Sequence, residues 1–285
     1  MKVKLLEPYG YCFGVKNGLN QLYRIKKDYQ DYKIHILGPF VHNKFTNTSL
    51  LKDGFIIFES TEQCDQLEYI NKLDNNKDII IFGLHGYYKQ VLDLLIARKF
   101  IYFDICCKFV RHNLDIVKNK NNTNYFIIGN ENHMEIKYLL SFLDNNYLVN
   151  NYEKLDKNKN YVLLNQTTMS IDTYDSCLDK LNNFIKNKER NICVEPARRY
   201  EIFKEHLLNN TYDYVFLVGD KTSANTNNLL EIYYKTTKNN NISIVTTLKE
   251  VEKINFNNVG KVLVLSGTSS DDNVVLSIYN YLKTK

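Results

Sequence analysis

The sequence has 285 residues, of which 44% are hydrophobic and 24% charged, so it can form a packed core and is not intrinsically disordered. No apolar run approaches the roughly 18–20 residues that span a bilayer, and the N-terminal stretch lacks the pattern of a signal or transit peptide. The net charge of +5 is small and diffuse, which argues against nucleic acid as a partner. We therefore expect a cytoplasmic protein with no membrane partner.

Short β-branched or aromatic runs alternate with amphipathic helical stretches along the whole chain. Helical periodicity is clear over 91–100, where apolar residues recur at i, i+3 and i+4. Strands that are buried on both faces and separated by helices are typical of parallel α/β architecture. The predicted strands are 2–7, 33–38, 78–84, 100–105, 124–129, 161–165, 213–219, 242–246 and 261–266.

Three of the six cysteines lie where a predicted strand gives way to a predicted helix. Cys12, Cys107 and Cys193 are separated by 95 (107 − 12) and 86 (193 − 107) residues, close to thirds of the chain. Helix N-termini favour the thiolate, which is the form that binds metal. The alternative is that each is a buried packing residue. The spacing predicts three small α/β domains, which we place at 13–105, 106–190, and 191–285 together with 1–12.

The other predicted strand ends carry histidines, hydroxyl groups and amides. Ligands of open α/β sheets bind beyond the carboxyl ends of the strands, and helix N-termini there offer N–H groups to anions. An anion site is therefore predicted. The competing interpretation is helix capping, which fully accounts for Ser170 and extends to Ser270. The strand-end residues that stand out are His42, His85, His133, Thr167, Ser223, Asn225 and Ser269.

Glu135 follows the strand 124–129 within this polar set. A carboxylate beside an anion pocket is unfavourable unless it is protonated or in chemical use, so Glu135 is a candidate proton donor. The alternative is a first-turn glutamate that favours the helix macrodipole. Three thiolates, an anion pocket and one acid together indicate an iron–sulphur cube with one iron left open for substrate.

These motifs, in this order, resemble the 4-hydroxy-3-methylbut-2-enyl diphosphate reductase family over nearly the whole chain. The family catalyses the last step of the methylerythritol phosphate route to isoprenoids. The resemblance covers its three cysteine motifs, its VHN, HG and QTT motifs, its acid-bearing segment and its serine/asparagine loop. In this sequence the matching segments are 10–15, 41–43, 85–86, 103–107, 128–135, 166–168, 192–193, 223–225 and Ser269.

The resemblance implies a [4Fe-4S] cluster held by Cys12, Cys107 and Cys193, at the centre of three α/β domains with pseudo-threefold symmetry. It implies reduction of the allylic diphosphate to isopentenyl and dimethylallyl diphosphates. Electrons would come from a ferredoxin-type or flavodoxin-type protein, because no flavin or nicotinamide fingerprint is visible. The implied catalytic residues are Glu135, Thr167 and His133. The implied substrate-binding residues are His42, His85, His133, Thr167, Ser223, Asn225 and Ser269.

The sequence departs from the family pattern at several positions. Ala224 stands where a second serine is usual, and Lys108 replaces the proline after the second cysteine. The segments 130–132 and 195–199 differ as well. Two other interpretations stay open: a non-catalytic cluster or diphosphate sensor derived from this family, and a cluster-free α/β protein that binds a phosphorylated ligand.

Overall fold

The computed structural model describes residues 1–119, 123–185, 191–256 and 259–285. Within these ranges the strands form three sheets, and every strand pair is parallel. This confirms the predicted α/β fold with small parallel sheets. The chain divides into two compact units: unit 1 comprises 1–17, 41–54 and 194–285, and unit 2 comprises 18–40 and 55–193.

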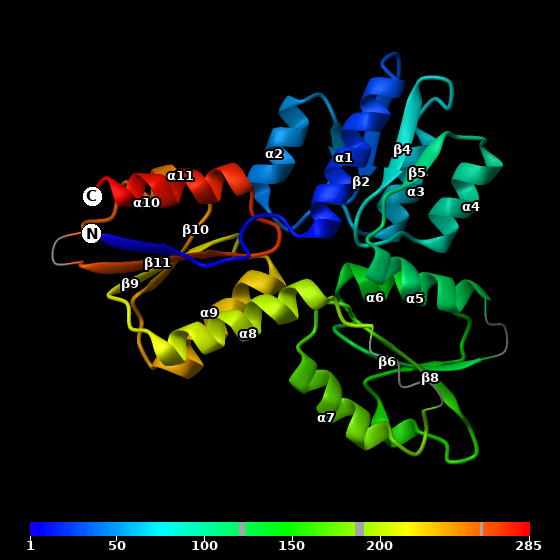
Figure 1. Cartoon of the computed structure of the whole chain (residues 1–285). Helices are drawn as coiled ribbons and strands as arrows, with labels where there is room; N and C mark the ends of the chain where they lie inside the picture. Colours follow the sequence, from blue (N-terminus) through cyan, green and yellow to red (C-terminus); the bar gives the residue numbers. More distant parts are fainter. Residues whose placement is uncertain (120–122, 186–190, 257–258) are drawn as a thin grey trace. The chain divides into compact units, whose positions relative to one another are not determined.

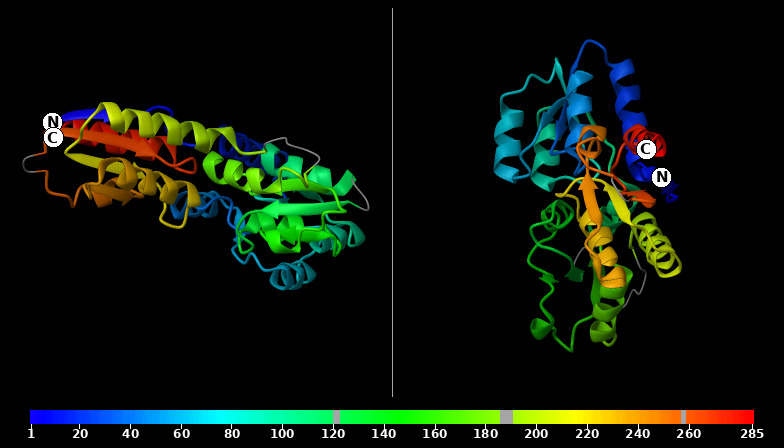
Figure 2. Two further views of the ribbon diagram at one scale, coloured as in Figure 1. Left: turned by 90° about the horizontal axis from the view of Figure 1, so that it is seen from below. Right: turned by 90° about the vertical axis from the view of Figure 1, so that its left-hand side faces the viewer.

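Unit 1 contains one four-stranded sheet in the order β1-β11-β9-β10. Helices α8 and α9 cover one face of this sheet, and α10 and α11 cover the other (Figure 1). The two chain ends lie close together beside β1 and β11 in every view (Figures 1 and 2). The strands are β1 (Lys2–Leu5), β9 (Tyr214–Val218), β10 (Ile242–Val245) and β11 (Lys261–Ser266). The helices are α2 (Lys44–Lys52), α8 (Val194–Asn209), α9 (Ala224–Thr237), α10 (Leu248–Val251) and α11 (Asp272–Lys283).

The central strand β9 shows how the core of unit 1 is built. Val215 and Leu217 pack with α8 and α9, whereas Phe216 and Val218 pack with α11, and all four are at most 1% exposed. Burial of each such side chain contributes roughly 1.5–3 kcal/mol. The strand is therefore fixed on both faces, and its carboxyl end presents the loop that leads into α9 at a defined edge of the sheet.

Unit 2 contains a four-stranded sheet, β3-β2-β4-β5, and a three-stranded sheet, β7-β6-β8. One core cluster includes Phe82 of β4, Ile127 of β6, Leu164 of β8 and side chains of α5 and α6, so the two sheets share a core. The strands are β2 (Lys33–Leu37), β3 (Ile56–Phe58), β4 (Asp78–Phe82), β5 (Tyr102–Asp104), β6 (Asn124–Ile128), β7 (Tyr147–Val149) and β8 (Tyr161–Asn165). The helices are α3 (Gln63–Asn71), α4 (Lys89–Ala97), α5 (Lys108–Asn119), α6 (Met134–Leu140), α7 (Ile171–Leu181) and the 3-10 turn η1 (Tyr152–Lys154). Helix α1 (Phe13–Asp28) begins in unit 1 and ends in unit 2.

All nine predicted strands are confirmed, with ends that agree within two residues. The strands β3 and β7 were not predicted, because each has three residues and lies at a sheet edge, too short for a periodic signal. No helix in the described part of the chain is long and apolar enough to cross a membrane.

The predicted division into three domains stays a prediction, as does the pseudo-threefold arrangement. Each sheet falls within one predicted domain, which agrees with the division. Residues 41–54, however, group with unit 1 and not with the rest of 13–105. The boundary at 190 falls in 186–190, outside the described residues.

Candidate functional site

The carboxyl group of Glu135 is buried in unit 2 and paired with Thr167. The side chain is 6% exposed. Thr167 donates its backbone N–H to Oε2 (2.7 Å) and its hydroxyl to Oε1 (2.5 Å). Burial raises the pKa of Glu135 to about 7, although the two hydrogen bonds from Thr167 oppose the shift. Glu135 can therefore hold a proton near neutral pH, as a proton donor must.

The start of α6 places Glu135 in this position. His133 is the N-cap of the helix, and its Nδ1 accepts the Glu135 N–H at 3.3 Å. Glu135 is thus also a first-turn acid, the alternative role that the sequence suggested. The segment after β8 is tied to β6 by the Gln166 N–H, which donates to the carbonyl of Ile128 (2.8 Å), so Thr167 is held opposite Glu135.

Two of the predicted ligand cysteines belong to unit 2. Cys107 directly precedes α5, and its N–H donates to the carbonyl of Leu84 (3.1 Å). Cys193 directly precedes α8, and its N–H donates to the carbonyl of Thr167 (2.7 Å). Both are partly exposed. Thr167 therefore contacts both the predicted acid and the backbone of a predicted ligand.

Cys106 differs from its neighbour Cys107. It is 7% exposed and lies in the core cluster of unit 2, where burial raises the pKa of its thiol. Packing is therefore the role that the structure supports for Cys106.

Two of the three predicted site histidines are neighbours within unit 2. His85 follows β4, and its ring centroid lies 6.3 Å from that of His133. The third, His42, belongs to unit 1, where it precedes α2. Burial lowers the pKa of His42, and the Asp220 carboxylate opposes this shift. The imidazole of His42 is therefore neutral at neutral pH, and a bound anion would favour its protonation.

Cys12, the third predicted ligand, lies in unit 1 at the start of α1. Its N–H donates to the carbonyl of Thr268 (2.8 Å), next to Ser269. Burial raises the pKa of the Cys12 thiol, whereas the N–H groups of Val15 and Gly14 lower it. The segment that carries Cys12 is thus joined to the segment that carries a predicted diphosphate-binding serine.

Polar atoms around the predicted diphosphate site are buried without partners. Asn225 and Ser269 are 5% and 8% exposed, yet Oδ1 and Nδ2 of Asn225 and Oγ of Ser269 have no hydrogen-bond partner among the described residues. Thr226 Oγ1 is a further such atom. A Cβ at Gly267 would lie 3.3 Å from Asn225 Nδ2 and 2.8 Å from Thr226 Oγ1, so only glycine permits this approach. An unpaired buried polar group costs about 1–3 kcal/mol, so these atoms do not stabilise the fold, and their donors and acceptors suit the predicted anion site.

Two serines of this region form hydrogen bonds to the backbone, one at the start of a helix and one at the end of a strand. Ser223 caps α9, since its side chain accepts the Thr226 N–H at 3.4 Å. The expectation that Ser270 caps α11 is wrong: Asp271 is the cap, and Ser270 donates to the carbonyl of Val218 (2.7 Å). The carboxylate of Asp271 accepts two N–H groups of the first turn, which a single hydroxyl does less well.

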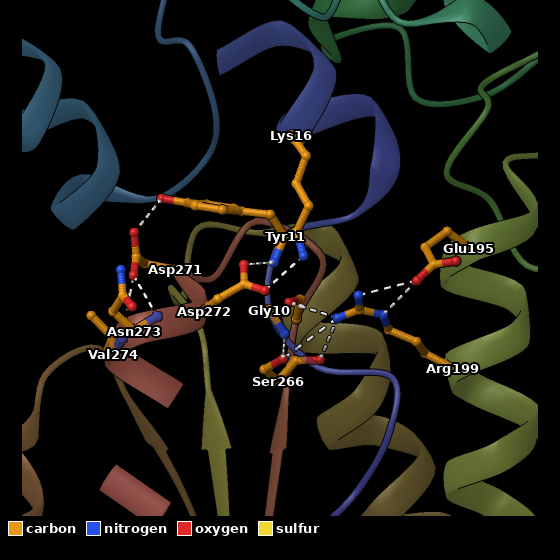
Figure 3. A network of polar contacts seen from close by, with 11 residues as sticks. Gly10, Tyr11, Lys16, Glu195, Arg199, Ser266, Asp271, Asp272, Asn273 and Val274 are labelled. Atoms are coloured by element: carbon orange, nitrogen blue, oxygen red, sulfur yellow. Dashed lines mark hydrogen bonds and ion pairs between the residues drawn. The ribbon is translucent and has the colours of Figure 1, made fainter. Parts of the chain in front are cut away.

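A charged network that the sequence did not reveal braces the Cys12 segment (Figure 3). Arg199 of α8 is 4% exposed, and its guanidinium donates to the carbonyls of Gly267 (3.0 Å) and Ser266 (3.3 Å) and to Glu195. Ser266 Oγ accepts the Gly10 N–H (2.8 Å). From the sequence, residues 195–199 are only a departure from the family pattern. The role of Arg199 is not evident there, because the burial of an arginine cannot be predicted from its position alone.

Asp272 completes the brace from the other side. Its carboxylate accepts the Tyr11 N–H (3.0 Å) and pairs with Lys16 Nζ (2.7 Å). Tyr11 in turn contacts Asp271 through its hydroxyl (3.2 Å). The segment 10–12 is therefore held by the starts of α1 and α11 and by the end of β11 (Figure 3).

The family model for the LytB protein matches residues 3–283 of this chain. The chain belongs to the LytB family. A 4-hydroxy-3-methylbut-2-enyl diphosphate reductase of Wigglesworthia glossinidia brevipalpis is 29% identical, over 99% of this chain and 90% of that protein. A reductase of the same name from Fusobacterium nucleatum is 28% identical, but the chain spans only 34% of its length. This membership confirms the predicted resemblance.

The fold agrees with solved structures. The E-1-hydroxy-2-methyl-but-2-enyl-4-diphosphate reductase of Plasmodium falciparum matches with a TM-score of 0.82 at 23% identity, over 99% of this chain and 88% of that one. An (E)-4-hydroxy-3-methyl-but-2-enyl diphosphate reductase matches with a TM-score of 0.71 over the full length of both chains. These matches support the fold of three small parallel sheets.

The donor set fits an iron–sulphur cluster in its chemistry. Cys12, Cys107 and Cys193 are partly exposed, and each directly precedes a helix, where the thiolate that binds metal is favoured. Unit 1 supplies one of them and unit 2 supplies two. Within neither unit do the described residues bring three His, Cys, Asp or Glu side chains together as a metal site. The shared cluster stays a prediction.

Proposed function

We propose that this chain is a 4-hydroxy-3-methylbut-2-enyl diphosphate reductase. The reaction takes the allylic alcohol diphosphate, two electrons and two protons, and it releases water with isopentenyl or dimethylallyl diphosphate. The carbon–oxygen bond to the hydroxyl group breaks, and the oxygen leaves as water with one added proton. The two electrons and the second proton form a new C–H bond on the allylic fragment. Family membership supports the proposal, and the observation that carries it is the buried Glu135–Thr167 pair, in which the acid has a pKa of about 7.

Unit 1 would supply unpaired buried donors to the diphosphate end of the substrate. Its unpaired buried groups, Asn225 Nδ2 and Ser269 Oγ, can donate to phosphate oxygens, and His42 can do so once protonated. Hydrogen bonds to charged groups contribute about 1.5–3 kcal/mol each. His85, His133 and Ser223 complete the proposed contacts, the last two in addition to their capping roles.

Unit 2 would hold the proton. Burial disfavours the carboxylate and raises the pKa of Glu135 to about 7, so a large fraction of Glu135 carries a proton near neutral pH. Thr167 orients that proton, since its hydroxyl lies 2.5 Å from Oε1 and can rotate to accept as well as donate. His133 positions Glu135 through the cap of α6. Glu135 is the proton source in this proposal, and Thr167 is its relay to the substrate hydroxyl.

Cys12, Cys107 and Cys193 would hold a [4Fe-4S] cluster. When bound, such a cluster supplies electrons and a Lewis-acidic iron position beside the substrate hydroxyl. A ferredoxin-type or flavodoxin-type protein would deliver the electrons. Cysteine ligands of such a cluster persist in a reducing compartment, so we propose a cytoplasmic location.

The experiment is turnover with dithionite as the electron donor, after anaerobic reconstitution with iron and sulphide. We expect formation of both isoprenoid diphosphates. Glu135→Gln should retain substrate binding and lose about 10²–10⁴-fold in turnover. Glu131→Gln is the matched control, because Glu131 is an exposed acid in the same loop. Unchanged turnover in Glu135→Gln would refute its assignment as the proton donor.

A second candidate function is that of a non-catalytic diphosphate sensor derived from this family. One residue favours it. Ala224 lies in the diphosphate loop and lacks the hydroxyl that the family usually has there. A sensor would bind the allylic diphosphate and form no product under the same reducing conditions. The turnover assay therefore separates the two proposals directly.

A further inference from the structure

Three asparagines of unit 2 form a closed ring of hydrogen bonds that the proposed reaction does not use. Asn191 donates through Nδ2 to Oδ1 of Asn113 (2.7 Å). Asn113 donates to the carbonyl of Asn165 (2.8 Å), and Asn165 donates to the carbonyl of Asn191 (3.2 Å). Asn113 and Asn165 are 5% and 2% exposed. A buried ring of paired amides fixes one relative arrangement of the segments that it joins.

The ring joins three segments that carry proposed site residues. Asn113 lies on α5, the helix that starts directly after Cys107. Asn165 ends β8, two positions before Thr167. Asn191 lies two positions before Cys193 and also donates to the carbonyl of Phe109 (2.9 Å) in the first turn of α5. The segment of Cys193 is thereby fastened to the helix of Cys107.

The ring also borders the proposed acid. A small cavity of unit 2 is lined by Asn113, Asn165 and Glu135, together with apolar side chains of α5 and α6. A shift of α5 would therefore disturb the Glu135 carboxyl as well as the two cysteines.

We propose that Asn113, Asn165 and Asn191 are positioning residues that hold Cys107 and Cys193 in a metal-ready arrangement before any cluster is bound. The inference rests on the proposed function in one respect, that these two cysteines are ligands. It assigns a role to the segment before the third cysteine, where Asn191 supplies two N–H donors that no other residue type of its size provides.

Asn191→Asp is the sharpest variant, because it keeps the size and shape of the side chain. It replaces the two N–H donors with a carboxylate that faces the carbonyl of Phe109 and Oδ1 of Asn113. Asn113→Leu removes the neighbouring link while it keeps the volume. Asn132→Asp is the matched control, since Asn132 is an exposed asparagine of the same unit.

The test uses the full chain with Cys12, Cys64, Cys106 and Cys177 replaced by serine, so that only Cys107 and Cys193 remain. Cd²⁺ alone is titrated anaerobically, and binding is followed by thiolate-to-metal absorption. We expect Asn191→Asp and Asn113→Leu each to weaken Cd²⁺ binding at least tenfold. The double variant should lose little more than the worse single variant, because both act on one ring. Asn132→Asp should change the affinity less than twofold.

Thermal unfolding of each variant separates positioning from stability. If Asn191→Asp does not fold, Asn191→Ser replaces it, since serine keeps one donor. A lower melting temperature with unchanged Cd²⁺ affinity would overturn the proposal. The readout needs neither a cluster nor turnover, so a failed reductase assay alongside the expected Cd²⁺ result would reject the proposed function and leave the ring's role intact.

Discussion

The two units differ in their buried polar groups, because unit 1 contains unpaired ones beside paired groups such as Arg199 and Ser270. Among the described residues, every buried side-chain nitrogen or oxygen without a partner belongs to unit 1, on Asn225, Thr226 and Ser269. In unit 2, the Glu135 carboxyl and the asparagine ring are paired within the protein. Paired groups give a fixed arrangement, whereas unpaired buried groups cost free energy and leave their hydrogen bonds unmade. The contrast underlies the proposal that unit 1 supplies unpaired donors for the diphosphate and that unit 2 stores the proton.

The largest expected effect tests the proton store of unit 2. The pKa of Glu135 is about 7 in the folded chain and 4.5 as an ordinary value. Its favourable contribution is thus complete below pH 4.5 and is lost as pH rises through 7. The wild type should lose up to about 3 kcal/mol of unfolding free energy over this range relative to Glu135→Gln. The glutamine imitates the protonated acid toward Thr167.

Urea unfolding of the apoprotein at several pH values measures this difference. Glu131→Gln, at an exposed site, should follow the wild-type curve. Parallel curves for wild type and Glu135→Gln would mean that Glu135 does not retain its proton on folding.

The next effect tests the unpaired groups of unit 1, with two adjacent serines as a matched pair. Ser269→Ala removes an unpaired hydroxyl and should weaken binding of inorganic pyrophosphate about 10–100-fold without lowering stability. Ser270→Ala removes a hydroxyl that donates to Val218 and should lower stability by about 1 kcal/mol. Calorimetric titration and thermal unfolding give the two readouts. Equal pyrophosphate affinity in wild type and Ser269→Ala would show that the unpaired hydroxyl of Ser269 does not bind the diphosphate.

The smallest effect concerns Ala224, the exposed first residue of α9. Ala224→Ser restores the hydroxyl that the family usually has in this loop. We expect pyrophosphate to bind about 2–10-fold more tightly, since an exposed hydrogen bond contributes only about 0.5–1.5 kcal/mol. The same titration checks it. Weaker binding would show that the loop has adapted to alanine.

The sequence predicted the strands, the parallel sheets and the family, because buried strands and ordered motifs are local signals. It did not predict β3 and β7, which are too short for periodicity. It also did not predict the contacts of Arg199 or the asparagine ring, because the partners lie far apart in the sequence. Asn113 and Asn191, for example, are separated by 78 residues. The unpaired state of Asn225 and Ser269 is likewise a property of packing that no motif records.

The most direct test of the account is the cysteine dependence of the cluster. Anaerobically reconstituted wild type should contain iron and sulphide and give an electron paramagnetic resonance signal on reduction. Replacement of each proposed ligand by serine (Cys12, Cys107 or Cys193) should abolish that signal, whereas Cys64→Ser and Cys177→Ser should leave it unchanged. A signal that survives loss of Cys12 would contradict a cluster that needs all three of these cysteines.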